Sequence, residues 1–315
     1  MTTGQSSSHV LAIHGGAGVI EPSAMTPQSE RSYREGIAAA LAAGHRVLAG
    51  GGSSLDAVVA AVATMEDDPQ FNAGRGAAFT ADGKNELDAA IMDGATLKAG
   101  GVTLVTRVRN PIRLARLVME RTRHVLLAGE GAEALARECG LELVEPRYFF
   151  TERRWNALRR IKDAAVAQRP NAITEADRHG TVGAVALDAV GNLAAATSTG
   201  GRNNKLAGWI GDSPIVGAGT YANNVTAAVS CTGEGEYFMR ALAAHTVSAL
   251  MEMKGWDLRQ AAEHVMHERL GAIGGKGGLI ALDRAGNVAM PFSSRGMYRG
   301  VVRADGEPTV SVYHD

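Results

Sequence analysis

Two copies of one apolar pattern constrain the fold of this 315-residue chain. The stretch Gly183-Ala-Val-Ala-Leu-Asp-x-x-Gly-Asn-x-Ala returns later as Gly278-Leu-Ile-Ala-Leu-Asp-x-x-Gly-Asn-x-Ala. The apolar residues run on without alternation, which indicates strands that are covered on both faces. The polar step between two apolar runs predicts a hairpin, in which 181–188 pairs with 193–199. Two such copies predict paired hairpins in adjacent sheets rather than a solenoid.

Helical patterns alternate with further strands in the rest of the chain. Residues 29–49 repeat apolar side chains at helical spacing, and Gly50-Gly51-Gly52 ends that helix. Ser53 or Ser54 caps the next helix, and Pro111 opens another. This succession predicts an α/β sandwich of layered helices and sheets. The other expected elements are strands at 10–14, 86–92 and 102–106 and helices at 131–138, 234–253 and 257–270.

Two polar stretches interrupt these elements. Residues 66–76 combine acids, Pro69 and glycines, which predicts an ordered, solvated loop without the spacing of a calcium site. Residues 151–179 are rich in charge and hold Pro170, which predicts a helix that decays into an exposed linker. We expect this flexible linker to cover about 152–180, and we interpret its charge as a solvated face.

Composition excludes several classes of function. The net charge of −1 gives no reason to expect a nucleic-acid or anionic-membrane partner. The chain lacks an apolar run of 18 residues, and its polar first eight residues do not resemble a signal peptide. Its two cysteines give no disulfide framework and fit a reducing compartment. We therefore expect a soluble, cytoplasmic protein.

Glycines and histidines beside the predicted elements give only weak functional signals. Gly15 to Gly18 follow the first strand, but the spacings of nucleotide-binding loops are absent, so we expect a tight turn. His14 has no partner at metal-ligand spacing and is expected to be a packed or hydrogen-bonded core residue. His264 and His267 lie three residues apart without a third ligand, so no metal site is expected there.

The Gly180–Thr181 step at the start of the first hairpin can supply a nucleophile. A threonine hydroxyl needs a base, and an N-terminal α-amine is one that enzymes use. Such an amine has a pKa of roughly 7.7–8.0, so part of it is neutral near pH 7. Cleavage of the Gly180–Thr181 bond would create base and nucleophile together. Gly180 suits this reaction because it permits a strained backbone and open approach to its carbonyl.

Three later residues could support this nucleophile. Thr199 could hydrogen-bond the Thr181 hydroxyl, while Thr232 and Gly233, at a predicted helix start, could donate to an oxyanion. The plainer interpretation is that these threonines are ordinary strand residues with satisfied hydroxyls. The residues taken alone favour that plainer interpretation.

Short ordered motifs run through nearly the whole chain, from His14-Gly-Gly-Ala-Gly to Gly296-Met-Tyr-Arg. Between them stand Phe71-Asn-Ala-Gly, Glu86-Leu-Asp-Ala, His179-Gly-Thr-Val-Gly-Ala-Val-Ala, Thr197-Ser-Thr-Gly-Gly, Asn204-Lys-Leu, Gly211-Asp-Ser-Pro, Gly217-Ala-Gly, Tyr221-Ala and Ser230-Cys-Thr-Gly. With this set the chain resembles the plant-type asparaginases, also called isoaspartyl peptidases or β-aspartyl-peptidases, which are N-terminal nucleophile hydrolases.

The resemblance implies a fold, an assembly and an activity. The fold would be a single αββα four-layer sandwich. Self-cleavage at Gly180–Thr181 would give an α subunit, 1–180, and a β subunit, 181–315, and two such pairs would form a homodimer. The substrates would be L-asparagine and β-aspartyl dipeptides, and no organic cofactor is expected.

The resemblance also implies site residues by position. The expected catalytic residues are Thr181 as nucleophile, Thr199 as support for its hydroxyl, and Thr232 and Gly233 as oxyanion hole. The expected substrate-binding residues are Asp212 for the α-ammonium, Gly235, Asn72 near the nucleophile, and Trp209 and Arg202. A structural sodium ion is implied on main-chain carbonyls of Met65, Glu66, Asp68, Phe71, Ala73 and Arg75.

One residue departs from the family pattern. Trp209 stands where the family carries an arginine that clamps the substrate's α-carboxylate. Tryptophan offers one N–H donor and no charge, and a lost hydrogen bond to a charged group costs about 1.5–3 kcal/mol. Arg202 could replace the clamp, or the substrate could lack a free carboxylate there. We favour a third interpretation, a weakened variant that still cleaves itself.

Other functions remain open at this point. A glycosylasparaginase-like amidase is a close alternative, which the expected location and the asparaginase-like motifs make weaker. An unprocessed, non-catalytic binding protein of the same fold is the alternative from another class. The retained Thr181, Thr199, Thr232 and Gly233 speak against that binding protein, and Trp209 speaks mildly for it.

Overall fold

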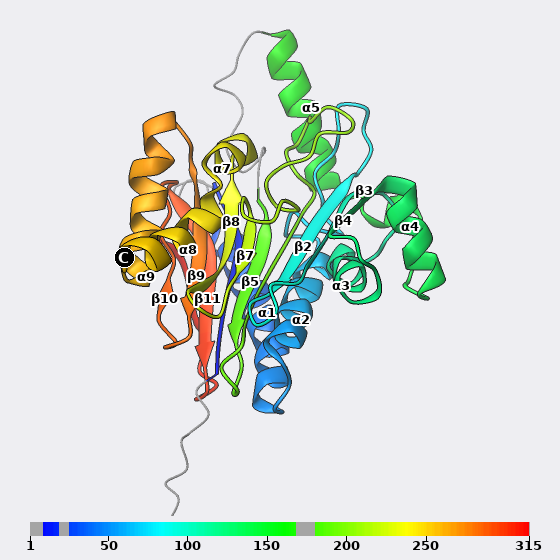
Figure 1. Ribbon diagram of the computed structural model, residues 1–315. Coiled ribbons are helices and arrows are strands. Elements are labelled where there is room, and N and C mark those ends of the chain that lie inside the picture. The colour runs from blue at the N-terminus through cyan, green and yellow to red at the C-terminus, as the bar shows by residue number, and fades with distance from the viewer. Residues whose placement is uncertain (1–8, 19–24, 168–179, 315) are drawn as a thin grey trace, which may run out of the picture.

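The computed structural model describes residues 9–18, 25–167 and 180–314. Within these residues two sheets pack face to face, and helices cover both outer sides (Figure 1). The larger sheet has the strand order β12-β11-β1-β5-β6-β2-β3-β4, and the smaller has the order β10-β9-β8-β7. The architecture is the expected αββα sandwich.

The elements alternate as the sequence pattern indicates. The strands are β1 (Val10–Ala17), β2 (Leu87–Asp93), β3 (Ala99–Val105), β4 (Leu126–Ala128), β5 (Val182–Leu187), β6 (Leu193–Thr199), β7 (Thr220–Ala222), β8 (Ala227–Gly233), β9 (Gly277–Asp283), β10 (Val288–Ala289), β11 (Gly296–Arg303) and β12 (Thr309–Tyr313). The α-helices are α1 (Pro27–Ala49), α2 (Ser54–Asp67), α3 (Pro111–Arg121), α4 (Gly129–Glu138), α5 (Glu152–Val166), α7 (Gly235–Ala241), α8 (Ala243–Lys254) and α9 (Leu258–Glu263).

The two hairpins with the repeated pattern lie in different sheets. β5 pairs with β6 in the larger sheet, and β9 pairs with β10 in the smaller one. Val185 and Leu187 of β5 belong to the same buried layer as Ile280 and Leu282 of β9. Helices cover the opposite faces of both sheets, which explains why the apolar residues do not alternate. The prediction of paired hairpins in adjacent sheets is confirmed.

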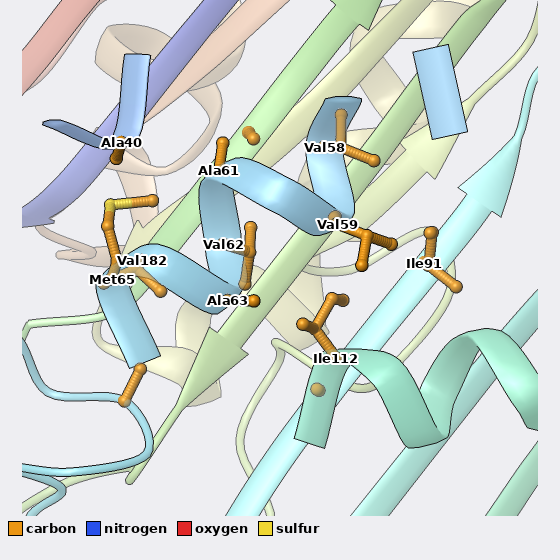
Figure 2. Close-up of a cluster of buried hydrophobic side chains, with 14 of the residues drawn as sticks. Ala40, Val58, Val59, Ala61, Val62, Ala63, Met65, Ile91, Ile112 and Val182 are labelled. Carbon is orange, nitrogen blue, oxygen red and sulfur yellow. The ribbon is translucent and has the colours of Figure 1, made fainter. Parts of the chain in front are cut away.

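Helices α1, α2 and α3 cover the outer face of the larger sheet. Ser53 accepts a hydrogen bond from the Asp56 N–H and caps α2, as one of the two residues predicted for that role. Figure 2 shows the apolar side chains of α2, including Met65, gathered with Val182 of β5, Ile91 of β2 and Ile112 of α3. This packing fixes α2 directly behind the strand that begins after Thr181.

Helices α7, α8 and α9 cover the smaller sheet and correct two predicted boundaries. The single helix expected over 234–253 is two helices, because Leu242 takes a left-handed conformation with φ 47°. The helix expected over 257–270 is α9 followed by a π-helical turn, His264–Arg269. No helix in the described part of the chain is long and apolar enough to cross a membrane.

Two stretches predicted to lie outside the regular elements belong in part to them. The turn predicted at Gly15–Gly18 is largely part of a strand, and the solvated loop predicted at 66–76 begins inside a helix. β1 continues through Gly15 and Gly16 to Ala17 with an irregularity in its pairing after His14. Glu66 belongs to α2 and is fully buried, so this stretch is not a solvated turn. It accepts hydrogen bonds from the Ser198 hydroxyl (2.6 Å) and the Ile112 N–H (3.0 Å), and burial raises its pKa to about 8.

The stretch 151–179 begins with the expected helix, but the flexible, solvated character predicted from residue 152 onward is wrong over that helix. Residues 152–166 form α5, which buries Ala157, Leu158 and Ile161 against the body of the protein. Arg154, expected on a solvated face, is only 4% exposed. The apolar spacing was hidden among charged residues, so a charge count underestimated the buried face. The remainder of the predicted linker, 168–179, lies outside the described residues.

Candidate active site

The Gly180–Thr181 bond lies at the start of β5, in the middle of the larger sheet. β5 pairs with β1 on one side and with β6 on the other. Thr181 is 7% exposed, and Gly180 has a φ of 138°, a conformation that favours glycine. A Cβ on Gly16 of β1, which has a φ of 113°, would lie only 2.7 Å from the Gly180 Cα. Glycine is therefore required on both sides of this close backbone contact.

Thr199 lies next to the expected nucleophile. The Thr181 hydroxyl donates a hydrogen bond to the Thr199 hydroxyl oxygen over 3.1 Å. The Gly201 N–H donates to the same oxygen over 2.9 Å. Thr199 is 2% exposed at the end of β6, so these bonds hold the Thr181 hydroxyl in one direction. The sequence placed these two threonines together correctly.

Thr232 approaches the same bond from the smaller sheet. Its hydroxyl oxygen accepts from the Thr181 N–H over 3.4 Å and from the Ala17 N–H over 3.2 Å. Gly233 follows Thr232 at the end of β8 and lines the cavity in front of Thr181. Because Thr232 accepts both bonds, its own hydroxyl proton remains available for donation.

His14 holds the other side of Thr181, a contact that the sequence did not reveal. A carbonyl can only accept, so Nδ1–H donates to the Thr181 oxygen over 3.0 Å and Nε2 accepts from the Ser230 hydroxyl over 2.9 Å. Burial lowers the His14 pKa to about 3, so the ring stays neutral. The expected hydrogen-bonded core histidine is confirmed. Only the pairing of β1 with β5 puts it beside Thr181.

A small cavity of about 10 Å³ opens in front of Thr181, and we call it the substrate cavity. Asp212 lies in its wall, 4% exposed, and Oδ2 has no hydrogen-bond partner among the described residues. Burial raises the Asp212 pKa to about 7, and Glu236 adds to this through its charge. A Cβ on Gly235 would lie 2.9 Å from the Asp212 Oδ1, so glycine leaves room for this carboxylate. The cavity is lined by Gly180, Thr181, Thr199, Gly201, Arg202, Trp209, Gly211, Asp212, Ser213, Gly233, Gly235 and Glu236.

Trp209 and Arg202 both line the substrate cavity, but only Arg202 has polar groups that could still bind a substrate. The Trp209 indole N–H donates to the Glu236 carboxylate over 3.0 Å. The Arg202 guanidinium makes no hydrogen bond or ion pair within the described residues, and it is the one cationic side chain that they contribute to this cavity. Glu236 was not among the predicted site residues. It bonds to Trp209, the residue at which this chain departs from the family pattern.

Asn72 lies behind the scissile bond rather than in the substrate cavity. Its Cβ is 3.5 Å from the position that a Cβ on Gly180 would take. The side-chain amide donates to the Gly201 oxygen over 2.7 Å and accepts from the Ala78 N–H over 2.6 Å. These contacts position the loop that follows Thr199. Asn72 lines a second cavity together with Arg153 and Arg154.

Main-chain carbonyls gather where the resemblance implies a sodium ion. A Cβ on Gly76 would lie 2.5 Å from the Pro69 oxygen and 2.7 Å from the Phe71 oxygen. The Met65 oxygen has lost its helical donor, because residue 69 is a proline without an N–H. Carbonyl oxygens are donors that a hard cation accepts, but Pro69 is not among the six expected ligands, and its oxygen already accepts a hydrogen bond from Arg153 over 3.2 Å.

Two of the six expected carbonyls already accept hydrogen bonds. The Glu66 oxygen accepts from the Arg75 N–H over 2.7 Å, and the Asp68 oxygen accepts from the Phe71 N–H over 3.2 Å. Each carbonyl has a second lone pair, so these bonds do not exclude a cation. No cluster of three or more His, Cys, Asp or Glu side chains competes for a metal in the part of the chain that the structure describes.

Comparison with known proteins points to one family. The profile of the family described as "Asparaginase" matches residues 7–312. The isoaspartyl peptidase of Escherichia coli (strain K12) is 52% identical over 309 residues, which cover 97% of this chain and 96% of that protein. The probable isoaspartyl peptidase/L-asparaginase 2 of Arabidopsis thaliana is 40% identical, with 96% and 98% covered. The isoaspartyl peptidase/L-asparaginase of Rattus norvegicus is 42% identical, with 91% and 84% covered.

Proposed function

The chain belongs to the asparaginase family, and from this premise we propose that it is a self-cleaving threonine hydrolase of L-asparagine and β-aspartyl dipeptides. The reaction is inferred from the names of the relatives, which are isoaspartyl peptidases and L-asparaginases. For this chain the proposal rests on the hydrogen bond between the hydroxyls of Thr181 and Thr199. The nucleophile becomes active only after the chain is cut before it. The active form is then a homodimer of cleaved α and β subunits in the cytoplasm.

Self-cleavage begins at the buried hydroxyl of Thr181. Its oxygen attacks the Gly180 carbonyl carbon, the C–N bond breaks, and the nitrogen takes up the proton. This leaves an ester between Gly180 and the Thr181 oxygen. Water then hydrolyses the ester to a Gly180 carboxylate and a Thr181 with free hydroxyl and α-amine. Thr232 and His14 support the step because they hold the Thr181 N–H and C=O, respectively.

The same residues then act on the substrate. The new α-amine takes the hydroxyl proton, and the Thr181 oxygen attacks the side-chain amide carbon of the substrate. The Thr232 hydroxyl and the Gly233 N–H donate to the oxyanion that forms. Ammonia or an amino acid leaves, and water hydrolyses the β-aspartyl ester to aspartate. Asp212 holds the substrate α-ammonium, which is the counter-charge that its buried carboxylate lacks.

A sodium ion fits the carbonyls at 65–75 and would have a structural role. Met65, whose oxygen faces a proline without an N–H four residues on, and Phe71, whose oxygen lies beside Gly76, would be among the oxygens that hold it. Such an ion would stiffen the loop that carries Asn72, which in turn holds Gly201.

The proposal is tested on the purified full-length protein. Intact masses should show two pieces that meet at Gly180–Thr181, and ammonia should be released from L-asparagine. A cleaved protein that hydrolyses glycosylated asparagine in preference would support the glycosylasparaginase-like alternative. A chain that stays whole on incubation and still binds aspartate would support the unprocessed binding protein.

Gly16→Ala should slow self-cleavage. The new Cβ would meet the Gly180 Cα at 2.7 Å in a backbone conformation that strains any side chain. Strain on the order of 1–3 kcal/mol at this bond should slow cleavage about tenfold or more. The measurement is the cleaved fraction over time by mass. Gly51→Ala is the matched control, because Gly51 also has a positive φ but meets nothing within 4 Å. Equal cleavage in both variants would contradict the close-contact argument.

We infer that Arg202 binds the substrate α-carboxylate in place of the arginine missing at position 209. Arg202 lines the substrate cavity, and the Trp209 N–H is already occupied by Glu236. Arg202→Ala should raise the KM for β-aspartyl dipeptides about tenfold to a hundredfold. The double variant Arg202→Ala/Trp209→Arg should lower it again. An unchanged KM in Arg202→Ala, together with a lower KM in Trp209→Arg alone, would restore the interpretation of a weakened variant.

A further inference from the structure

Gly180 separates two cavities that differ in charge. The substrate cavity lies on one side, and on the other lies a cavity of about 30 Å³, which we call the rear cavity. Gly180 is the one described residue that lines both. The rear cavity is lined by Gly15, Gly16, Ala17, Gly18, Tyr33, Gln70, Asn72, Arg153, Arg154, Gly180 and Tyr298.

The charges of the two cavities have opposite signs. The described lining of the substrate cavity contributes two carboxylates, Asp212 and Glu236, and one cation, Arg202. The described lining of the rear cavity contributes two cations, Arg153 and Arg154, and no carboxylate. The rear cavity therefore attracts an anion produced at Gly180 more strongly than the substrate cavity does.

Arg154 is held beside Gly180 by the fold. Its Nε donates to the Gly76 oxygen over 2.9 Å, and its carbonyl accepts from the Asn203 amide over 3.3 Å. A Cβ on Gly180 would lie 3.8 Å from the Arg154 Nη2. A carboxylate carbon is likewise one bond from the Gly180 Cα. Rotation about the unhindered glycine backbone is enough to bring that carboxylate to the guanidinium.

Arg153 closes the rear cavity at its outer side. Its Nη1 donates to the Tyr33 hydroxyl over 2.8 Å, and its Nη2 donates to the oxygen of Pro69 over 3.2 Å. Tyr33 in turn stacks on Tyr298, with ring centroids 4.1 Å apart. These contacts fix a second positive charge near the cavity. The volume of the rear cavity is large enough for water-sized groups such as carboxylate oxygens.

We propose that the rear cavity is a carboxylate-binding site for the new C-terminus of the α subunit. The inference rests on the proposed self-cleavage. Hydrolysis of the Gly180–Thr181 ester consumes one water, restores the Thr181 hydroxyl, and leaves a carboxylate on Gly180. Arg154 takes that carboxylate into the rear cavity. The end of the α subunit then stays out of the substrate cavity, where it would otherwise occupy the space in front of the freed Thr181.

A carboxypeptidase challenge of the cleaved protein tests this site. We would follow the mass of the α subunit in the wild type, Arg154→Gln, Arg154→Lys and Arg159→Gln. The wild type should keep Gly180, because a bound C-terminus is protected. Arg154→Gln should lose Gly180 about tenfold faster or more, since a charged hydrogen bond is removed. Arg154→Lys should be partly protected. Arg159→Gln is the control, because Arg159 is exposed on the same helix.

A second measurement uses only the wild-type protein, so it still tests the site if the Arg154 variants fail to fold or to cleave. In wild-type protein labelled with [1-¹³C]glycine, one glycine carbon becomes a carboxylate on cleavage. Its pKa should lie below the ordinary C-terminal value of roughly 3.3–3.7, because Arg154 stabilises the charge. An ordinary pKa, or wild-type trimming as fast as in Arg154→Gln, overturns the site. A wild-type chain that never cleaves refutes the proposed function instead, so the two failures are distinct.

Discussion

Thr181→Ala should leave the chain in one piece and without hydrolase activity. Alanine has no oxygen to attack the Gly180 carbonyl, so neither the ester nor the free α-amine can form. Activity should fall by at least about 10⁴-fold, as expected when a nucleophile is removed. Intact mass should give a single species near 32.8 kDa at all times. The fold should survive, because Thr181 contributes one side-chain hydrogen bond at the edge of a cavity.

Thr181→Ser is the matched control for that result. Serine keeps the oxygen and loses the methyl group that restricts its direction, so cleavage should continue at a lower rate. A second control, Thr199→Ala, removes the acceptor of the Thr181 hydroxyl and should slow cleavage without abolishing it. Two pieces in the Thr181→Ala sample would contradict the proposal, because the cut would then need no nucleophile at this position.

Asp212→Asn should weaken substrate binding strongly. The Asp212 carboxylate is buried in the cavity wall and its Oδ2 has no partner among the described residues, so we expect the α-ammonium of the substrate to supply the missing counter-charge. Loss of that charged bond should raise KM about tenfold to a hundredfold. The chain should still cleave itself, since Asp212 does not contact the scissile bond in any described interaction. Cleaved masses with a raised KM would separate binding from activation.

The same carboxylate should make substrate binding depend on pH. Burial raises the Asp212 pKa from 3.8 to about 7, whereas a bound ammonium group favours the ionised form. KM should therefore be lowest above pH 7 and rise as the pH falls below it, by up to about tenfold per pH unit. This rise should be absent in Asp212→Asn. A pH profile that is identical in both proteins would remove Asp212 as the titrating group.

Asp212→Asn should weaken substrate binding but stabilise the folded protein at alkaline pH. The folded state binds the Asp212 proton more tightly than the unfolded state, so stability falls as the pH rises from about 4 to 7 and the deficit persists above pH 7. The asparagine side chain of the variant has no charge to desolvate. At pH 8 the substitution should therefore raise Tm, by about 2–4 °C for each kcal/mol regained. A lower Tm in that variant would mean that the carboxylate has a partner in the folded chain.

Local patterns predicted the core of the fold because burial imposes a period on the sequence. The uninterrupted apolar runs of the two hairpins indicated strands covered on both faces, and Val185 and Ile280 confirm this in the buried layer between the sheets. The same reasoning predicted a helix at the start of 151–179 but missed its buried face, because charged neighbours concealed Leu158 and Ile161. It also failed to predict the break between α7 and α8, because Leu242 takes the left-handed conformation there and no glycine or proline marks the break in the sequence.

The sequence by itself singled out the Gly180–Thr181 step, because a nucleophile released by cleavage needs only two adjacent residues, and the ordered motifs of the family resemblance turned that step into a prediction. Only the tertiary structure decided what surrounds that step. His14 reaches Thr181 through the pairing of β1 with β5, and Thr232 comes from the other sheet. These contacts join residues separated by 167 and 51 positions, respectively. No local period encodes such distances, since they depend on how sheets and helices pack together.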